Sequence, residues 1–166
     1  LDRDRNGTLS EEELLSFRDG ALTQAFVRRM LQERVTYNGE VDFKGYLDLV
    51  IATSDPSHPS SIRWFFSILD THHKGYLSTD DIAFFFRDIQ RRLEATGNEV
   101  PKIGDLVPEL LDLVHPANPP HITVTDILKA PSGFVLLNIL TDVTAFWSYD
   151  NRAKLPARPP SDEEAE

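Results

Sequence analysis

Residues 2–13 constrain the fold of this chain more than any other stretch, because side chains with oxygen atoms alternate there around a single glycine. Gly7 stands at the sixth position of this stretch, where the backbone must turn too sharply for a residue with a Cβ atom. Leu9 follows two positions later and can pair as a short strand with a second loop. The oxygen donors are Asp2, Asp4, Asn6, the backbone carbonyl of Thr8, Ser10 and Glu13.

This spacing is that of the calcium-binding EF-hand loop. Ca²⁺ prefers six to eight oxygen ligands, and the final Glu of such a loop binds with both carboxylate oxygens. We therefore predict one Ca²⁺ site, with Asp2, Asp4, Asn6, Thr8, Ser10 and Glu13 as its ligands. The alternative is an acidic turn on a solvated surface, which would not need every position to match.

The loop starts at residue 2, so the helix that should enter it is missing from the sequence. We expect the chain to be a piece of a longer protein. A loop that is held by a helix at one end only is less preorganised, so the expected calcium affinity is modest.

Three further stretches repeat the turn and the apolar residue that follows it. The apolar positions are Leu9, Val41, Leu77 and Ile122, at intervals of about 32 to 45 residues. Loops of this kind join in pairs through these residues. The sequence therefore predicts an all-α fold of two EF-hand pairs with short β pairings between their loops, followed by C-terminal helices.

The second and fourth loops lack the ligands for an ion. Arg34 and Gly45 occupy the first and last ligand positions of the second loop, and His115 begins the fourth, which also contains Pro119 and Pro120. We interpret both loops as structural partners of the first and third.

The third loop keeps carboxylates at its two ends, in Asp70 and Asp81, but His72 and Lys74 replace the ligands between them. A lysine ammonium competes with an ion for the same carboxylates, and Asp81 is one methylene shorter than the usual Glu. We predict that this loop is empty, although partial occupancy through Asp70, Ser78 and Asp81 stays open.

Proline positions and apolar periodicity divide the chain. The predicted helices include one from Glu11 to Asp19 and one over 43–53, whose core face we assign to Phe43, Tyr46, Leu47, Val50 and Ile51. The predicted parts are a first EF-hand pair (1–54), a linker (55–61), a second, degenerate pair (62–130), C-terminal helices (131–155) and a disordered acidic tail (156–166).

Composition excludes several classes of partner. The formal charge is −10, with 27 acidic and 17 basic residues, which argues against nucleic acid and anionic membranes because both attract clustered Lys and Arg. There is no cysteine, so disulfides and thiol catalysis are excluded. No apolar run approaches the ~20 residues of a membrane span.

Other patterns favour ordinary structural interpretations. The five histidines stand mostly in loops and are expected to be solvated rather than to bind a transition metal. Phe84, Phe85 and Phe86 favour a core position, with an exposed groove for a partner helix as the alternative. The pairs Arg28-Arg29 and Arg91-Arg92 are expected on solvated faces rather than in phosphate sites. No nucleophile elbow, P-loop or paired catalytic acids are found.

Several stretches carry a family resemblance: FRDGALTQAFVRRMLQERVTYNGEVDFKGYLDLV, SIRWFFSILDTHHKGYLSTDDIAFFFRDIQ and FWSYDNR. Together they resemble the calcium-binding regulatory subunits of protein phosphatase 2A called B-double-prime, above all the shorter gamma-type branch, over residues 1 to about 153. The resemblance implies a non-catalytic subunit that binds the scaffold and catalytic subunits of the phosphatase and directs it to substrates. It also implies a cytoplasmic or nuclear location, or one at centrosomes or cortical microtubule arrays. The third loop departs from longer family members, in which it is fully acidic.

Two other functional classes stay open. One is a free-standing calcium sensor that opens a hydrophobic groove, against which stand the single complete loop and the single methionine, Met30. The other is a structural scaffold that binds partner helices without regard to calcium.

Overall fold

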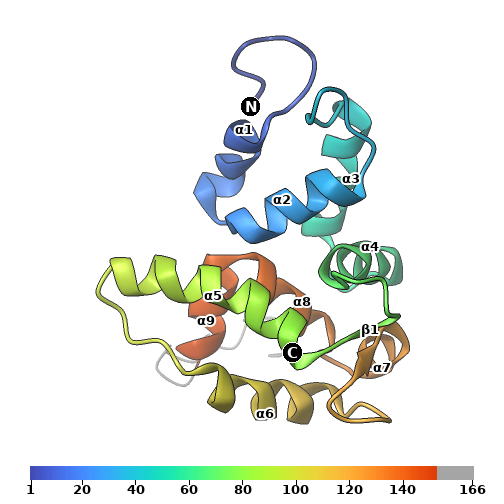
Figure 1. The fold of residues 1–166 in the computed structure, drawn as a ribbon, viewed down its shortest axis with the longest axis vertical. Coiled ribbons are helices and arrows are strands. Elements are labelled where there is room, and N and C mark those ends of the chain that lie inside the picture. The colour runs from blue at the N-terminus through green and yellow to red at the C-terminus, as the bar shows by residue number, and fades with distance from the viewer. Residues whose placement is uncertain (153–166) are drawn as a thin grey trace, which may run out of the picture.

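The structure, a computed structural model, describes residues 1–152. Helices dominate this range, and the only strands in it are two residues long each (Figure 1). The elements in chain order are α1 (Glu11–Leu15), η1 (Phe17–Gly20, a 3₁₀ helix), α2 (Gln24–Glu33), α3 (Phe43–Ser54), α4 (Pro59–Leu69), β1 (Tyr76–Leu77), α5 (Thr79–Ala95), α6 (Ile103–Val114), β2 (Ile122–Thr123), α7 (Val124–Lys129), α8 (Phe134–Thr141) and α9 (Val143–Asp150). The predicted all-α class is confirmed.

The four loops join in two pairs, as their apolar residues predict. Leu9 and Val41 exchange two backbone hydrogen bonds, of 2.7 and 3.1 Å. β1 and β2 pair antiparallel, with Leu77 opposite Ile122. All four side chains are buried, so each pairing also contributes to the core.

Side-chain caps fix where each loop passes into its exit helix. Ser10, Ser78 and Thr123 each accept a hydrogen bond from the backbone N–H three residues later. The acidic residue at that later position returns a bond to the backbone of the capping residue, which satisfies two otherwise free N–H groups. Asp42 caps α3 through the Gly45 N–H. The loops and helices therefore follow one repeated plan.

One hydrophobic cluster runs through the whole described range, with α4 near its centre. α4 packs against α2 and α3 on one side and against α7 and α8 on the other. It begins at Pro59, inside the predicted 55–61 linker, because proline suits the first turn of a helix. The division into separate domains stays a prediction, and the predicted tail at 156–166 lies outside the described residues.

The helix predicted from Glu11 to Asp19 is too long. α1 ends at Leu15, and the Ser16 hydroxyl donates a 2.7 Å hydrogen bond to the carbonyl of Glu13. Such a bond competes with helix continuation. Arg18 and Asp19 then adopt left-handed backbone angles, with φ of 49° and 58°.

The predicted core face of α3 is wrong at three of its five residues, whereas Tyr46 packs partly buried against the core and Val50 is half-buried. α3 buries Leu49 and Ala52, whereas Phe43, Leu47 and Ile51 are 67%, 38% and 63% exposed. α4 packs against α3, and Phe17 of η1 lies edge-on against Tyr46 of α3, with ring centroids 6.2 Å apart. α3 is apolar on more than one face, so its sequence alone does not select the buried one.

The aromatic run on α5 is divided between core and surface. Phe85 and Phe86 are fully buried, whereas Phe84 is 45% exposed. No helix in residues 1–152 is both long enough and apolar enough to cross a membrane.

Candidate metal centre

The carboxylates of the first loop converge. One oxygen each from Asp2, Asp4 and Glu13 lie within 4.8 Å of one another, and no other group of three or more acidic or metal-ligating side chains in residues 1–152 does so. Three carboxylates at this separation repel one another unless a cation lies between them. The arrangement therefore fits a hard divalent cation.

The loop backbone holds the ligand side chains in place. Asp2 accepts hydrogen bonds from the N–H groups of Asn6 (3.2 Å) and Gly7 (3.0 Å), and Asp4 accepts one from Asn6 (3.1 Å). The Asn6 side-chain oxygen in turn accepts the N–H of Thr8, at 2.9 Å. Gly7 has φ of +86°, the left-handed region where glycine is favoured. The turn thus brings alternate side chains to one centre.

Glu13 closes the loop from the start of α1. Its Oε1 accepts the Arg3 N–H at 2.6 Å and its Oε2 accepts the Ser10 N–H at 3.0 Å, while the Ser10 hydroxyl accepts the Glu13 N–H at 3.3 Å. The side chain is buried, at 6% exposure. The amides of Ser10 and Arg3 lower the pKa of Glu13, so the carboxylate is charged at neutral pH.

The pKa of Asp4 is raised by its acidic neighbours. The Asn6 amide lowers the pKa of Asp4, but desolvation and the nearby Asp2 and Glu13 carboxyls together raise it more, so that its net shift is upward. Mutual repulsion of this kind is what a bound cation would relieve.

Glu40 is a neighbour of the site that the sequence did not reveal. It comes from the second loop, and its Oε2 accepts hydrogen bonds from the Asn6 side-chain amide (3.0 Å) and from the Thr8 hydroxyl. Its position next to the pairing residue Val41 is the one signal that could have indicated it. The second loop therefore contributes a carboxylate beside the first loop although it lacks its own ligand set.

The third loop follows the same backbone path as the first. Asp70 accepts the N–H groups of Lys74 (3.0 Å) and Gly75 (2.7 Å), as Asp2 does with the equivalent residues of the first loop. His73 and Gly75 have positive φ, matching Arg5 and Gly7. The two loops differ in what fills their centres.

Lys74 fills the centre of the third loop. Its Nζ lies 2.7 Å from Asp81 Oδ2 and 3.3 Å from Ser78 Oγ. Burial raises the pKa of Asp81, but the Lys74 ammonium and the hydrogen-bond donors of Ser78 and Thr71 lower it by more, so that the net pKa is about 2. The hydrogen bond to Asp81 raises the pKa of Lys74. The ammonium is thus a covalently attached cation in place of a metal ion.

The second loop uses its first ligand position for packing. The Arg34 guanidinium donates hydrogen bonds to the Trp64 carbonyl (3.1 Å) and to Ser67 Oγ (2.5 Å), both on α4. Desolvation lowers the pKa of Arg34. A positive charge that ties the loop to α4 therefore stands where a calcium ligand would be.

The fourth loop turns its acidic residue to its own backbone. Asp126 accepts the N–H groups of Thr123 (2.8 Å) and Ala117 (3.2 Å), and it belongs to no group of three or more metal-ligating side chains in the described range. The histidines form no metal cluster among residues 1–152 either. His121, for example, stacks on Tyr76 with ring centroids 4.0 Å apart.

Comparison with known proteins supplies the family. No protein-family model matches the chain. The gamma B'' regulatory subunit of serine/threonine-protein phosphatase 2A from Xenopus tropicalis is 40% identical over 157 residues, which cover 95% of this chain and 35% of the relative. The chain is a homologue of the B'' regulatory subunits. The human gamma B'' subunit is 38% identical over the same length. The resemblance found in the sequence is confirmed, and the chain spans about a third of the length of these B'' relatives.

A solved structure is also similar to this chain. It is a PP2A PR70 holoenzyme labelled diCa, and one of its chains matches with a TM-score of 0.83 and 25% identity. The match covers 89% of this chain and 55% of that chain.

Proposed function

We propose that this chain is part of a non-catalytic, calcium-binding regulatory subunit that assembles or targets a protein phosphatase 2A holoenzyme. The observation that carries the proposal is the convergence of Asp2, Asp4 and Glu13 in a loop of a chain that is 40% identical to a gamma B'' subunit. The partners we propose are the phosphatase scaffold and catalytic subunits, since the matching solved chain belongs to a PP2A holoenzyme.

The proposed ion is Ca²⁺. Asp2, Asp4, Asn6, Ser10 and Glu13 would supply side-chain oxygens and Thr8 its backbone carbonyl, an all-oxygen set of the kind that Ca²⁺ prefers. When bound, the ion would offset the repulsion between the carboxylates. The label diCa of the related structure agrees with calcium binding in this family.

The structure offers a route from the ion to the rest of the chain. Glu13 lies in the first turn of α1 and Leu9 is bonded to Val41 of the second loop. Ordering of the first loop would therefore bias the position of α1 and of the loop before α3. Allosteric couplings are typically ~1–3 kcal/mol, so we expect calcium to alter holoenzyme assembly by a modest factor.

The test uses the full-length protein with purified scaffold and catalytic subunits. Asp2→Ala should weaken assembly or shift its calcium dependence, because it removes one ligand of the ion. Assembly that is equal in calcium and in chelator, for both the parent and the variant, would contradict a regulatory role of the ion. Failure of the parent protein to bind the scaffold would contradict the proposed function as a whole.

A second candidate is a free-standing EF-hand sensor or a structural scaffold for partner helices. It is favoured by the exposed apolar stripe of α3, formed by Phe43, Leu47 and Ile51. A sensor would capture an amphipathic helical peptide only in calcium, and a scaffold would do so with or without it. Neither would require the phosphatase subunits.

For location we propose the cytoplasm or nucleus, including centrosomes and cortical microtubule arrays. The net charge of −10 disfavours nucleic acid and anionic membranes as partners. Fluorescent tagging of the full-length protein tests the location directly.

A further inference from the structure

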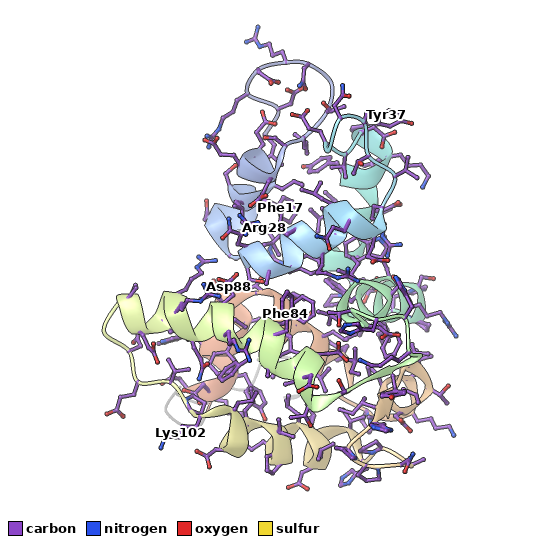
Figure 2. All side chains as sticks on the ribbon, viewed as in Figure 1. Phe17, Arg28, Tyr37, Phe84, Asp88 and Lys102 are labelled. Carbon is purple, nitrogen blue, oxygen red and sulfur yellow. The ribbon has the colours of Figure 1, made fainter. Side chains whose placement is uncertain are left out.

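A groove of about 260 Å³ lies between α2 and α5. Four of the side chains that line it are arginines: Arg28, Arg29, Arg87 and Arg91. Figure 2 shows Arg28 on α2, with Phe84 and Asp88 on the neighbouring α5. Such a concentration of arginine is notable in a chain of formal charge −10.

The four guanidinium groups differ in how far they are neutralised. Arg29 is largely buried and pairs with Glu33 at 2.7 Å, so its charge is satisfied within the fold. Arg28 meets Glu11 at 2.8 Å through its Nε but keeps 59% of its side chain exposed. Arg87 and Arg91 are exposed, and neither forms an ion pair with any residue in 1–152.

Arg87 and Arg91 stand one helical turn apart, so their side chains are neighbours on α5. Like charges at this spacing destabilise a helix slightly. Within residues 1–152 no carboxylate forms an ion pair with either arginine, although Asp88 lies between them in the sequence. Asp88 is used elsewhere, because its Oδ2 accepts the Ala25 N–H of α2 at 2.9 Å.

The same contacts fix the walls of the groove. Asp88 joins α5 to the first turn of α2, and Arg92 donates hydrogen bonds to the carbonyls of Leu22 (2.9 Å) and Gly20 (2.6 Å). α2 and α5 are therefore held at a set separation before any ligand arrives. A preformed site loses less entropy on binding.

Phe84 adds an apolar surface beside Arg87 and Arg91. It lies three positions before Arg87 and seven before Arg91, on the same face of α5. Phe84 is 45% exposed, and its ring rests edge-on against Phe85 with centroids 5.0 Å apart. A ligand that matches this face needs carboxylates for the arginines and an apolar side chain for Phe84.

We propose that the groove between α2 and α5 binds an acidic peptide segment of a partner protein. Its carboxylates pair with Arg87 and Arg91, with Arg28 on the opposite wall, and an apolar side chain of the peptide covers Phe84. None of the residues that line the groove is a predicted calcium ligand, so an acidic peptide can bind there without a calcium ion.

The probe is a fluorescein-labelled peptide of six glutamates around one phenylalanine, titrated into the chain in excess chelator. The Arg87→Ala/Arg91→Ala variant should lose about tenfold or more in affinity, and Phe84→Ala severalfold. Arg63→Ala removes an exposed arginine of α4 outside the groove and should leave affinity within about twofold. Circular dichroism verifies that each variant folds.

Specificity is tested with two competitors. A peptide with glutamine in place of glutamate should bind far more weakly, and binding of the acidic peptide should weaken steeply with salt. Equal affinity for both peptides, or unchanged affinity of the Arg87→Ala/Arg91→Ala variant, would overturn the proposal. Tighter binding of a single-stranded oligonucleotide than of the acidic peptide would also overturn it.

Discussion

Lys74 should stabilise the third loop by occupying the place of a metal ion, and Lys74→Met tests this. The substitution keeps the length and the apolar stem of the side chain but removes the ammonium that lies 2.7 Å from Asp81 Oδ2. Asp81 is 2% exposed, so its carboxylate loses its cation while it stays buried. Breaking a buried pair on one side is destabilising.

The pKa of Asp81 sets the size of the effect. It lies at about 2, against an ordinary value of 3.8, and one pKa unit corresponds to about 1.4 kcal/mol. The environment of Asp81 thus stabilises the fold at neutral pH by about 2–3 kcal/mol. Lys74 is its main favourable partner, and water reaches part of the lysine, so we expect Lys74→Met to cost roughly 1–2 kcal/mol. For a chain of this size that lowers Tm by about 2–8 °C.

The pH dependence gives a second signature. Because the folded-state pKa of Asp81 is depressed, its stabilisation is present above the ordinary pKa and is lost as pH falls through about 2. The difference in unfolding free energy between the parent and Lys74→Met should therefore be full at pH 7 and shrink as the pH falls from about 4 to about 2.

The assay is urea unfolding in chelator, with Lys44→Met as the matched control. Lys44 also pairs with an aspartate, Asp48 at 3.2 Å, but its side chain is 82% exposed. Exposed pairs on a helix contribute only about 0.3–0.5 kcal/mol. Equal losses in the two variants at pH 7, or a Lys74→Met loss that persists undiminished in acid, would refute the assigned role of Lys74.

Three further outcomes are expected. The double substitution His72→Asp/Lys74→Asp should create a second calcium site, and calorimetry with no gain in stoichiometry would show that the loop geometry itself excludes the ion. Leu77→Ala should cost about 2–5 kcal/mol in urea unfolding, since Leu77 is fully buried at the β1–β2 pairing. Ile51→Ser should change stability by less than about 0.5 kcal/mol, because that side chain is exposed, and a large loss would place it in the core.

The sequence predicts this fold well at positions where a residue has only one favourable set of contacts. Leu9, Val41, Leu77 and Ile122 each follow a turn, and the structure pairs them as expected. The position of Lys74 is also predictable, because its ammonium pairs with the carboxylate that the same loop supplies.

Prediction fails where the outcome depends on a distant element. The buried face of α3 depends on how the helix packs against α4, which no local pattern encodes. Glu40 lies beside the first loop only because the two loops pair. The ligand set of the first loop stays a prediction, although Asp2, Asp4 and Glu13 do converge.

Calcium calorimetry on this chain tests the central claim most directly. The parent should bind one Ca²⁺ with modest affinity, and Glu13→Gln should abolish binding because it removes the charge of the closing ligand. Glu12→Gln makes the same change at an exposed neighbour and should leave the stoichiometry at one. Two equivalent sites, or calcium binding that survives Glu13→Gln, would contradict the assignment of the ion to the first loop.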